Sequence, residues 1–193
     1  MENFFDNLYD VLFSPAQALR RIGDEKRIGQ ALTVFLLSVL IPAVVLYFVF
    51  QSMELFKLGG FVLVIETIGR LLVWFVSAAV LHLIAEFFGG TGTAKGFFVA
   101  TGFAYLPQTL AVPFWVVAMF LPSQIMTALV GVTSLVVFFW TLTLNVLAIK
   151  EVHRISGAKA VLVLVTPAVV GGILLVGLLI IAFAAFMPER MLW

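Results

Sequence analysis

With 193 residues, of which 63% are hydrophobic and 11% are charged, the chain carries more apolar side chains than a water-soluble domain of its size can bury. A formal net charge of +1 argues against the strongly basic surface typical of nucleic-acid binding, so no nucleic-acid partner is expected. The absence of cysteine excludes disulfides and cysteine metal ligands. We predict an all-α, polytopic membrane protein whose solvent is the lipid bilayer.

Residues 1–28 are predicted to form a cytoplasmic segment of short amphipathic helices lying at the membrane interface. Apolar residues recur there at helical spacing, namely Phe4, Leu8, Val11 and Leu12. Ser14 and Pro15 are typical of the N-cap and first-turn proline of a second short helix, with Gly23 as its stop. The alternative for this segment is a flexible tail.

Residues 29–193 are predicted to form one transmembrane domain of five helices. The predicted spans cover residues 29–50, 60–88, 96–121, 123–149 and 160–187. Each is long enough to cross a hydrocarbon layer of about 30 Å. Because spans three and four meet at Pro122-Ser123, these two spans should form a tight helical hairpin.

Basic residues outside the spans predict the orientation. One side of the membrane receives Arg20, Arg21, Lys26, Arg27, Lys95, Lys150, Arg154 and Lys159. The other side receives Lys57 and Arg190. Since basic loops are retained in the cytoplasm, we expect a multi-pass protein of the cell (inner or plasma) membrane, with the N-terminus cytoplasmic and the C-terminus outside.

The second span carries two polar pairs. Glu66 and Arg70 stand in the acid-first order, four residues apart, that favours a helical ion pair. His82 and Glu86 form a second pair near the other end. We interpret both pairs as self-neutralised or hydrated at the membrane margins. The alternative is an ion or proton path, because ionisable groups inside membranes are often functional.

Proline interrupts the third span at Pro107 and Pro113, and neither can donate a hydrogen bond to the carbonyl four residues earlier. The freed carbonyls need partners within the protein, and Tyr105, Gln108 and Thr109 are candidates. Broken helices line substrate sites in many transporters, but five spans do not divide into two equal repeats. We therefore favour a kinked helix packed in the bundle over a substrate site.

Spans four and five carry weaker signals. Thr141 and Asn145 lie one turn apart, and hydrogen bonds between helices would explain them without a ligand. Ala168 and Gly172 form a small-residue pair that permits close helix packing, within the monomer or between copies as a homo-oligomer.

No enzyme, cofactor or resident metal is expected. The glycine-rich loop at residues 89–96 lacks the second glycine and the hydroxyl of a phosphate-binding loop, so we interpret it as a cytoplasmic turn. His82, Glu86, Glu151 and His153 could hold a divalent metal if they meet in space, but we favour hydrated interface residues. No serine or threonine stands in helical register with a histidine base.

Four short motifs follow one another along the chain. They are Leu12-Phe13-Ser14-Pro15, Gly89-Gly90-Thr91-Gly92, Gly102-Phe103-Ala104-Tyr105-Leu106-Pro107, and Glu151-Val152-His153-Arg154-Ile155-Ser156 followed by Lys159-Ala160. With these motifs the chain resembles the Yip family of membrane proteins, named after Ypt/Rab-interacting proteins, and looks most like its short bacterial and archaeal members. The resemblance implies five spans, a cytoplasmic N-terminus and a cytoplasmic side presented to partners.

Eukaryotic members of that family are associated with vesicle trafficking and with prenylated Rab GTPases, and they carry a longer acidic N-terminal region than the one seen here. The resemblance therefore implies an architecture more than an activity. Our leading hypothesis is an integral membrane scaffold or adaptor of the Yip-like type, acting through its cytoplasmic face in membrane organisation or trafficking. The alternative is a small channel or transporter that uses the Glu66–Arg70 pair and the broken third span.

A protein partner is expected at the cytoplasmic face. The residues predicted to form that face are Ser14, Pro15, Arg20, Arg21, Gly89, Gly90, Lys95, Glu151, His153 and Lys159.

Overall fold

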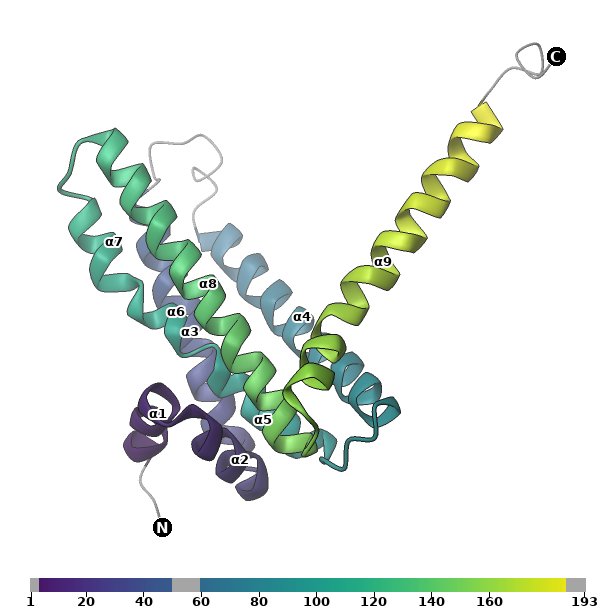
Figure 1. The fold of residues 1–193 in the computed structure, drawn as a ribbon. Coiled ribbons are helices and arrows are strands. Elements are labelled where there is room, and N and C mark those ends of the chain that lie inside the picture. Colours follow the sequence, from purple (N-terminus) through teal and green to yellow (C-terminus); the bar gives the residue numbers. More distant parts are fainter. Residues whose placement is uncertain (1–3, 50–59, 187–193) are drawn as a thin grey trace.

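The computed structural model describes residues 4–49 and 60–186, which are helical with short connections and contain no strand. The helices in chain order are α1 (Phe4–Phe13), α2 (Pro15–Glu25), α3 (Ile28–Val49), α4 (Gly60–Phe87), α5 (Ala94–Ala104), α6 (Pro107–Leu110), α7 (Val112–Ala118), α8 (Ser123–His153) and α9 (Gly157–Phe186). Figure 1 shows their arrangement. The predicted ends of spans one and five, at residues 50 and 187, lie outside the described residues, as do Lys57 and Arg190.

Five helical stretches are long and apolar enough to cross a membrane, which confirms the predicted all-α membrane protein with five spans. They are Ile28–Phe48, Gly60–Phe87, Ala94–Ala118, Ser123–His153 and Gly157–Phe183. The fourth continues past residue 149 to His153, and the fifth begins at Gly157 rather than at residue 160. As a result, the turn between α8 and α9 is short, and Arg154 begins it in the left-handed conformation with φ 56°.

Two helices precede the first span, and the second is built into the bundle. Helix α2 begins at Pro15, but the Ser14 side chain makes no capping hydrogen bond with the described chain. Leu19 and Ile22 are buried in the largest apolar cluster. The predicted stop at Gly23 is wrong, because α2 continues to Glu25. The placement of α1 and α2 at a membrane interface stays a prediction.

Gly23 serves close packing instead of helix termination. A Cβ atom built on Gly96 of α5 would lie 2.5 Å from the Gly23 carbonyl oxygen, closer than carbon and oxygen can approach. A Cβ on Gly23 would lie 2.8 Å from a methyl group of Val152 in α8. Glycine at both positions therefore lets α2 contact α5 and α8 directly.

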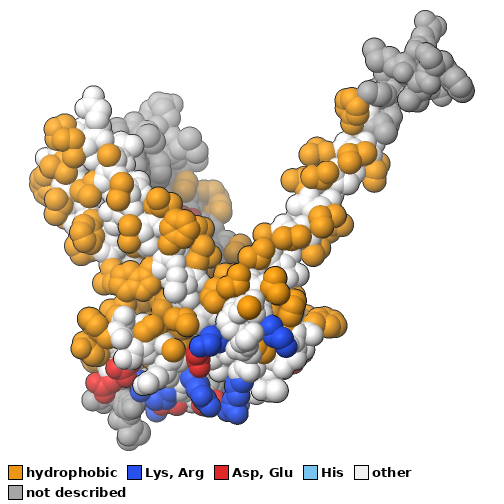
Figure 2. All heavy atoms as spheres, in the orientation of Figure 1, with side chains coloured by type: hydrophobic (Ala, Val, Ile, Leu, Met, Phe, Trp, Pro, Cys, Tyr) orange, Lys and Arg blue, Asp and Glu red, His pale blue; other side chains and the backbone are white. Residues whose placement is uncertain are grey.

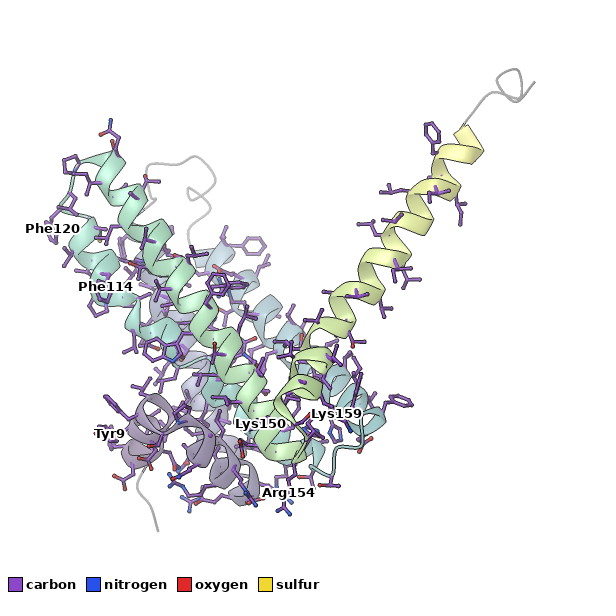
Figure 3. All side chains as sticks on the ribbon, viewed as in Figure 1. Tyr9, Phe114, Phe120, Lys150, Arg154 and Lys159 are labelled. Atoms are coloured by element: carbon purple, nitrogen blue, oxygen red, sulfur yellow. The ribbon has the colours of Figure 1, made fainter. Side chains whose placement is uncertain are left out.

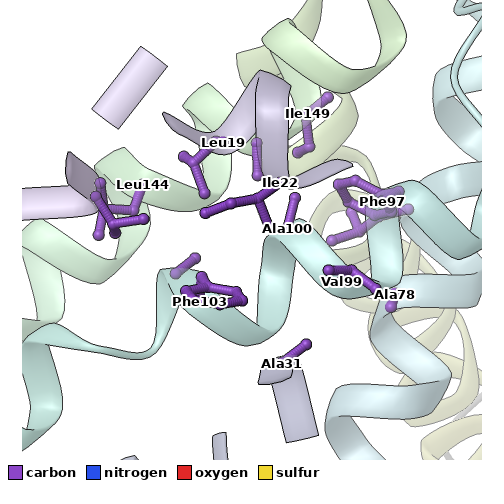
Figure 4. Packing of buried hydrophobic residues seen from close by; sticks show 14 of the residues in the cluster. Leu19, Ile22, Ala31, Ala78, Phe97, Val99, Ala100, Phe103, Leu144 and Ile149 are labelled. Atoms are coloured by element: carbon purple, nitrogen blue, oxygen red, sulfur yellow. The ribbon is translucent and has the colours of Figure 1, made fainter. Parts of the chain in front are cut away.

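The main core lies where α2, α5 and α8 meet (Figure 4). Helix α5 forms its centre, since Phe97 and Phe103 are fully buried there together with most of the helix. Leu144 and Ile149 of α8 and Leu19 of α2 pack around it. The largest apolar cluster thus sits toward one end of the molecule, beside α2.

The third span is broken into α5, α6 and α7 at its prolines. The carbonyl of Phe103, which Pro107 cannot reach, accepts a hydrogen bond from the Leu106 N–H at 3.0 Å. The partner of this carbonyl is therefore a backbone N–H in a tightened turn. It is not a side chain, as we had expected from the sequence. The Thr109 hydroxyl instead donates to the Ser38 hydroxyl of α3 at 3.2 Å.

Helix α9 leaves the bundle after its first turns (Figure 1). Near its start it packs against α8 and α4. Farther along, its apolar side chains are exposed, among them Ile173, Leu174, Ile181 and Phe183. Pro167 lies within the helix. An exposed apolar surface of this kind needs lipid or another apolar surface around it.

Charged side chains gather at one end of the molecule, as Figure 2 shows, and apolar side chains cover most of the rest of that view. We call this the basic end. It contains α2, the start of α5, the end of α8 and the start of α9. Lys150, Arg154 and Lys159 lie there, whereas Phe114 and Phe120 lie on the part of the bundle farthest from it (Figure 3).

Candidate functional site

Two histidines from different helices meet at the basic end, where α8 ends. Nδ1 of His82 in α4 lies 2.9 Å from Nε2 of His153, the last residue of α8. His153 is fully buried, and the edge of its ring meets Phe97 with 4.9 Å between centroids. Glu86 places a carboxylate oxygen 3.4 Å from Nε2 of His82. With both rings neutral, His153 can donate to His82, and His82 can donate in turn toward Glu86.

The loop at residues 88–93 is tied to this pair. The Thr91 N–H donates to the His153 carbonyl at 3.0 Å, and the Gly90 N–H donates to the Ala85 carbonyl at 2.8 Å. A Cβ on Gly90 would lie 2.8 Å from the Cβ of His153, so only glycine fits. Lys159 donates from Nζ to the Phe88 carbonyl at 2.9 Å. The loop is therefore held across the end of α8 by both α8 and α9.

A cleft of about 300 Å³ lies beside this loop, and we call it the polar cleft. Its lining comes from three segments of the chain: Gly23, Asp24 and Lys26 at the end of α2, Thr91, Gly92 and Thr93 in the loop, and Val152 and Arg154 at the end of α8. Lys26 and Arg154 each end a helix in the left-handed conformation, with φ of 54° and 56°. Neither side chain makes an ion pair or hydrogen bond with the described residues. Such a cleft can bind a polar or acidic group by charge and by hydrogen bonds.

Several residues predicted for the partner face are occupied in structural contacts. His153 is buried because α8 continues as a helix through that position and turns the ring toward α4 and α5. Arg21 donates to Asp10 at 2.8 Å and to Asn7 at 3.0 Å, which ties α2 to α1. Lys150 pairs with Glu151 at 2.9 Å.

The exposed members of the predicted face are Ser14, Arg20, Gly89, Lys95 and Lys159; Pro15 and Gly90 are half-buried. Sequence reasoning missed Lys26, Arg154, Thr91 and Thr93 as residues of one cleft. The sequence shows that these side chains are basic or carry hydroxyls. It does not show that α2 and α8 end in the left-handed conformation at Lys26 and Arg154, which brings the residues together.

The proposed metal set does not assemble. His82 contacts His153 through one ring nitrogen and Glu86 through the other, but Glu151 lies two residues before His153 on α8 and so faces another side of that helix. Within residues 4–49 and 60–186, no group of three or more histidine, aspartate or glutamate side chains is placed to hold a metal ion.

The Glu66–Arg70 pair forms on α4. Arg70 donates to one carboxylate oxygen of Glu66 from Nε at 3.0 Å and from Nη2 at 2.7 Å. Both side chains are partly exposed on the helix surface. The two charges therefore neutralise each other without help from another helix.

A separate cleft of about 570 Å³ lies among α4, α8 and α9, within the span region. Its polar lining consists of Ser77, Tyr105, Thr141 and Asn145. Asn145 donates to the Thr141 carbonyl of its own helix at 2.8 Å, so the interhelical bond that we expected is not the one it makes. Among the described residues, neither Glu66 nor Arg70 lines this cleft. Pro107 is buried and Gln108 half-buried at the break in the third span.

Comparison with known proteins identifies one family. A family profile described as the Yip1 domain matches residues 9–179, which is most of the chain. Searches of curated proteins and of solved structures gave no significant match.

Proposed function

The chain belongs to the Yip1 domain family and is a multi-pass membrane protein, and from this premise we propose that it is a non-enzymatic membrane adaptor that binds a protein partner at its basic end. The observation that carries this proposal is the polar cleft. Its walls come from the end of α2, the loop at residues 88–93 and the end of α8. Lys26 and Arg154 line it, and neither side chain pairs with another described residue.

Charge supports a cytoplasmic position for the basic end. The basic residues assigned to one side of the membrane lie in α2, at the start of α5, at the end of α8 and at the start of α9, or in the adjoining turns, so they belong to the basic end. Retention of basic segments in the cytoplasm would then place the polar cleft in that compartment. A partner in the cytoplasm would meet a surface that needs little rearrangement, because hydrogen bonds hold the loop to α8 and α9.

The chemistry of the cleft favours an acidic partner segment. Lys26 and Arg154 offer positive charge, and the hydroxyls of Thr91 and Thr93 add hydrogen-bonding groups. Asp24 stands in the same lining, so a segment that carries both acidic groups and a hydrogen-bond donor fits better than a simple anion.

The test is site-specific photo-crosslinking in native membranes. A photoreactive residue at Thr91 should give a discrete adduct, whereas one at Phe120, at the opposite end of the bundle, should not. Arg154→Glu should reduce the Thr91 adduct by about tenfold, because it replaces an attraction by a repulsion. Gln124→Glu adds a negative charge at the exposed start of α8, at the far end of that helix, and should leave the adduct unchanged.

Equal adducts at Thr91 and Phe120, or no loss with Arg154→Glu, would contradict the adaptor proposal. Deletion of residues 1–27 is not a usable test, because Leu19 and Ile22 belong to the core and their loss would disturb folding.

The alternative, a small channel or transporter, is supported by the cleft among α4, α8 and α9 but not by the Glu66–Arg70 pair, which lies outside its lining. Reconstituted liposomes would test it. If Asn145→Leu lowers the flux of a solute or of protons, the alternative is favoured. If Glu66→Gln lowers that flux, the transport path must pass outside this cleft, because Glu66 does not line it.

A further inference from the structure

A groove of about 640 Å³ lies among α3, α4 and α5. Its main lining residues are Leu32, Phe75, Ala78, Ala79, Lys95 and Phe98. None of these residues lines the polar cleft. Among the described lining residues, Lys95 alone is charged or polar. The groove is thus apolar along its length with one positive charge on its wall.

The aromatic wall of the groove is rigid. Phe98 stacks on Trp74 with 4.1 Å between ring centroids, and Phe75 meets Phe98 edge-on at 5.9 Å. Trp74 donates from its indole nitrogen to the Thr101 hydroxyl at 3.0 Å, and that hydroxyl donates to the Phe98 carbonyl at 2.9 Å. Since these contacts fix the rings from behind, the groove exists without a ligand to shape it.

Lys95 marks one end of the groove and the margin of a span. It is the second residue of α5, and α5 begins the third membrane span. Its side chain is exposed and makes no hydrogen bond or ion pair with any described residue. The N-terminus of α5 adds partial positive charge beside it. An anion at this position would therefore meet two sources of positive charge at the depth where lipid headgroups lie.

We propose that the groove binds one anionic phospholipid, with an acyl chain against Phe75 and Phe98 and the phosphate at Lys95. Charge complementarity selects the headgroup. The phosphate of either lipid could pair with Lys95. The amine of a zwitterionic lipid would then find no carboxylate in the described lining, whereas an anionic headgroup brings no amine that needs a partner. The inference does not rest on the adaptor role, because it uses neither the polar cleft nor its residues.

Native mass spectrometry of the purified full chain in detergent tests this proposal. Phosphatidylglycerol should bind at one saturable site, about fivefold more tightly than phosphatidylcholine with the same acyl chains. Lys95→Gln should remove that preference. Arg20→Gln, which removes one positive charge elsewhere on the basic end, should keep it.

A second variant tests the apolar part without changing charge. Ala79 is exposed on the groove wall, so Ala79→Phe should fill the groove and weaken both lipids. Val132→Phe adds the same ring on the exposed face of α8 and should leave binding unchanged.

The proposal would be overturned by equal binding of the two lipids to the unmodified chain, by a preference that survives Lys95→Gln, or by non-saturable binding. A competition with inorganic phosphate completes the experiment. If phosphate alone displaced phosphatidylglycerol at equal concentration, Lys95 would be a site for free phosphate and the acyl chain would contribute nothing.

Discussion

His82 and His153 lie 71 positions apart in the sequence, yet Nδ1 of the first and Nε2 of the second are 2.9 Å apart. This contact joins α4 to the end of α8 at the point where the loop at residues 88–93 is also hydrogen-bonded to α8. The contact therefore joins α4 to the helix end that supplies Val152 and Arg154 to the polar cleft.

Replacement of His153 should destabilise the protein. In His153→Leu, the ring nitrogen of His82 loses its partner in a mostly buried position, so the free energy of unfolding should fall by about 1–3 kcal/mol. Thermal unfolding in detergent measures this change. Glu86→Gln is the control, because that carboxylate is half exposed and its contact with His82 is long, at 3.4 Å. Equal melting temperatures for His153→Leu and the unmodified chain would show that the pair has no structural role.

The contact between Gly23 and Gly96 should not tolerate a side chain. Gly96→Ala places a methyl group 2.5 Å from a backbone carbonyl, and overpacking of this kind costs about 1–3 kcal/mol. Gly131→Ala makes the same substitution in the middle of α8, where nothing lies within 4 Å of the new methyl group. It should be neutral or stabilising, because alanine favours helix more than glycine does. Similar melting temperatures for the two variants would contradict close packing of α2 on α5.

Loss of Arg21 should loosen α1 and leave the packing around α5 intact. Arg21→Ala removes the ion pair with Asp10 and the hydrogen bond to Asn7, a side chain that is only 1% exposed. Amide exchange in α1 should become about fivefold faster, whereas exchange in α5 should not change. Hydrogen exchange followed by mass spectrometry measures both, with Arg20→Ala as the control. Faster exchange throughout the chain would mean that α1 and α5 unfold together.

The orientation can be tested with introduced cysteines, because the chain has none of its own. Ala158→Cys lies at the start of α9, at the basic end, and Phe120→Cys lies in the exposed turn before α8. If the basic end is cytoplasmic, an impermeant maleimide should label Phe120→Cys in intact cells and Ala158→Cys only after permeabilisation. The reverse pattern would overturn the proposed orientation and move the polar cleft to the outside.

The five spans could be predicted from the sequence because a membrane leaves the backbone few choices. Each apolar stretch must satisfy its own hydrogen bonds, so length and hydropathy are enough to identify a spanning helix. Local features could be predicted in the same way: α2 begins at Pro15, and Glu66 and Arg70 pair within one helix. In all these cases the interacting groups are neighbours along the chain.

Only the tertiary structure decided the contacts between distant segments. Gly23 was expected to end a helix and instead makes room for α5, and His153 was expected at the surface and is instead buried against His82 and Phe97. Lys26 and Arg154 share a cleft because two helices end beside each other. The physical reason is that a residue's own neighbours determine whether it is helical, whereas its burial and its partner depend on which helices pack against it.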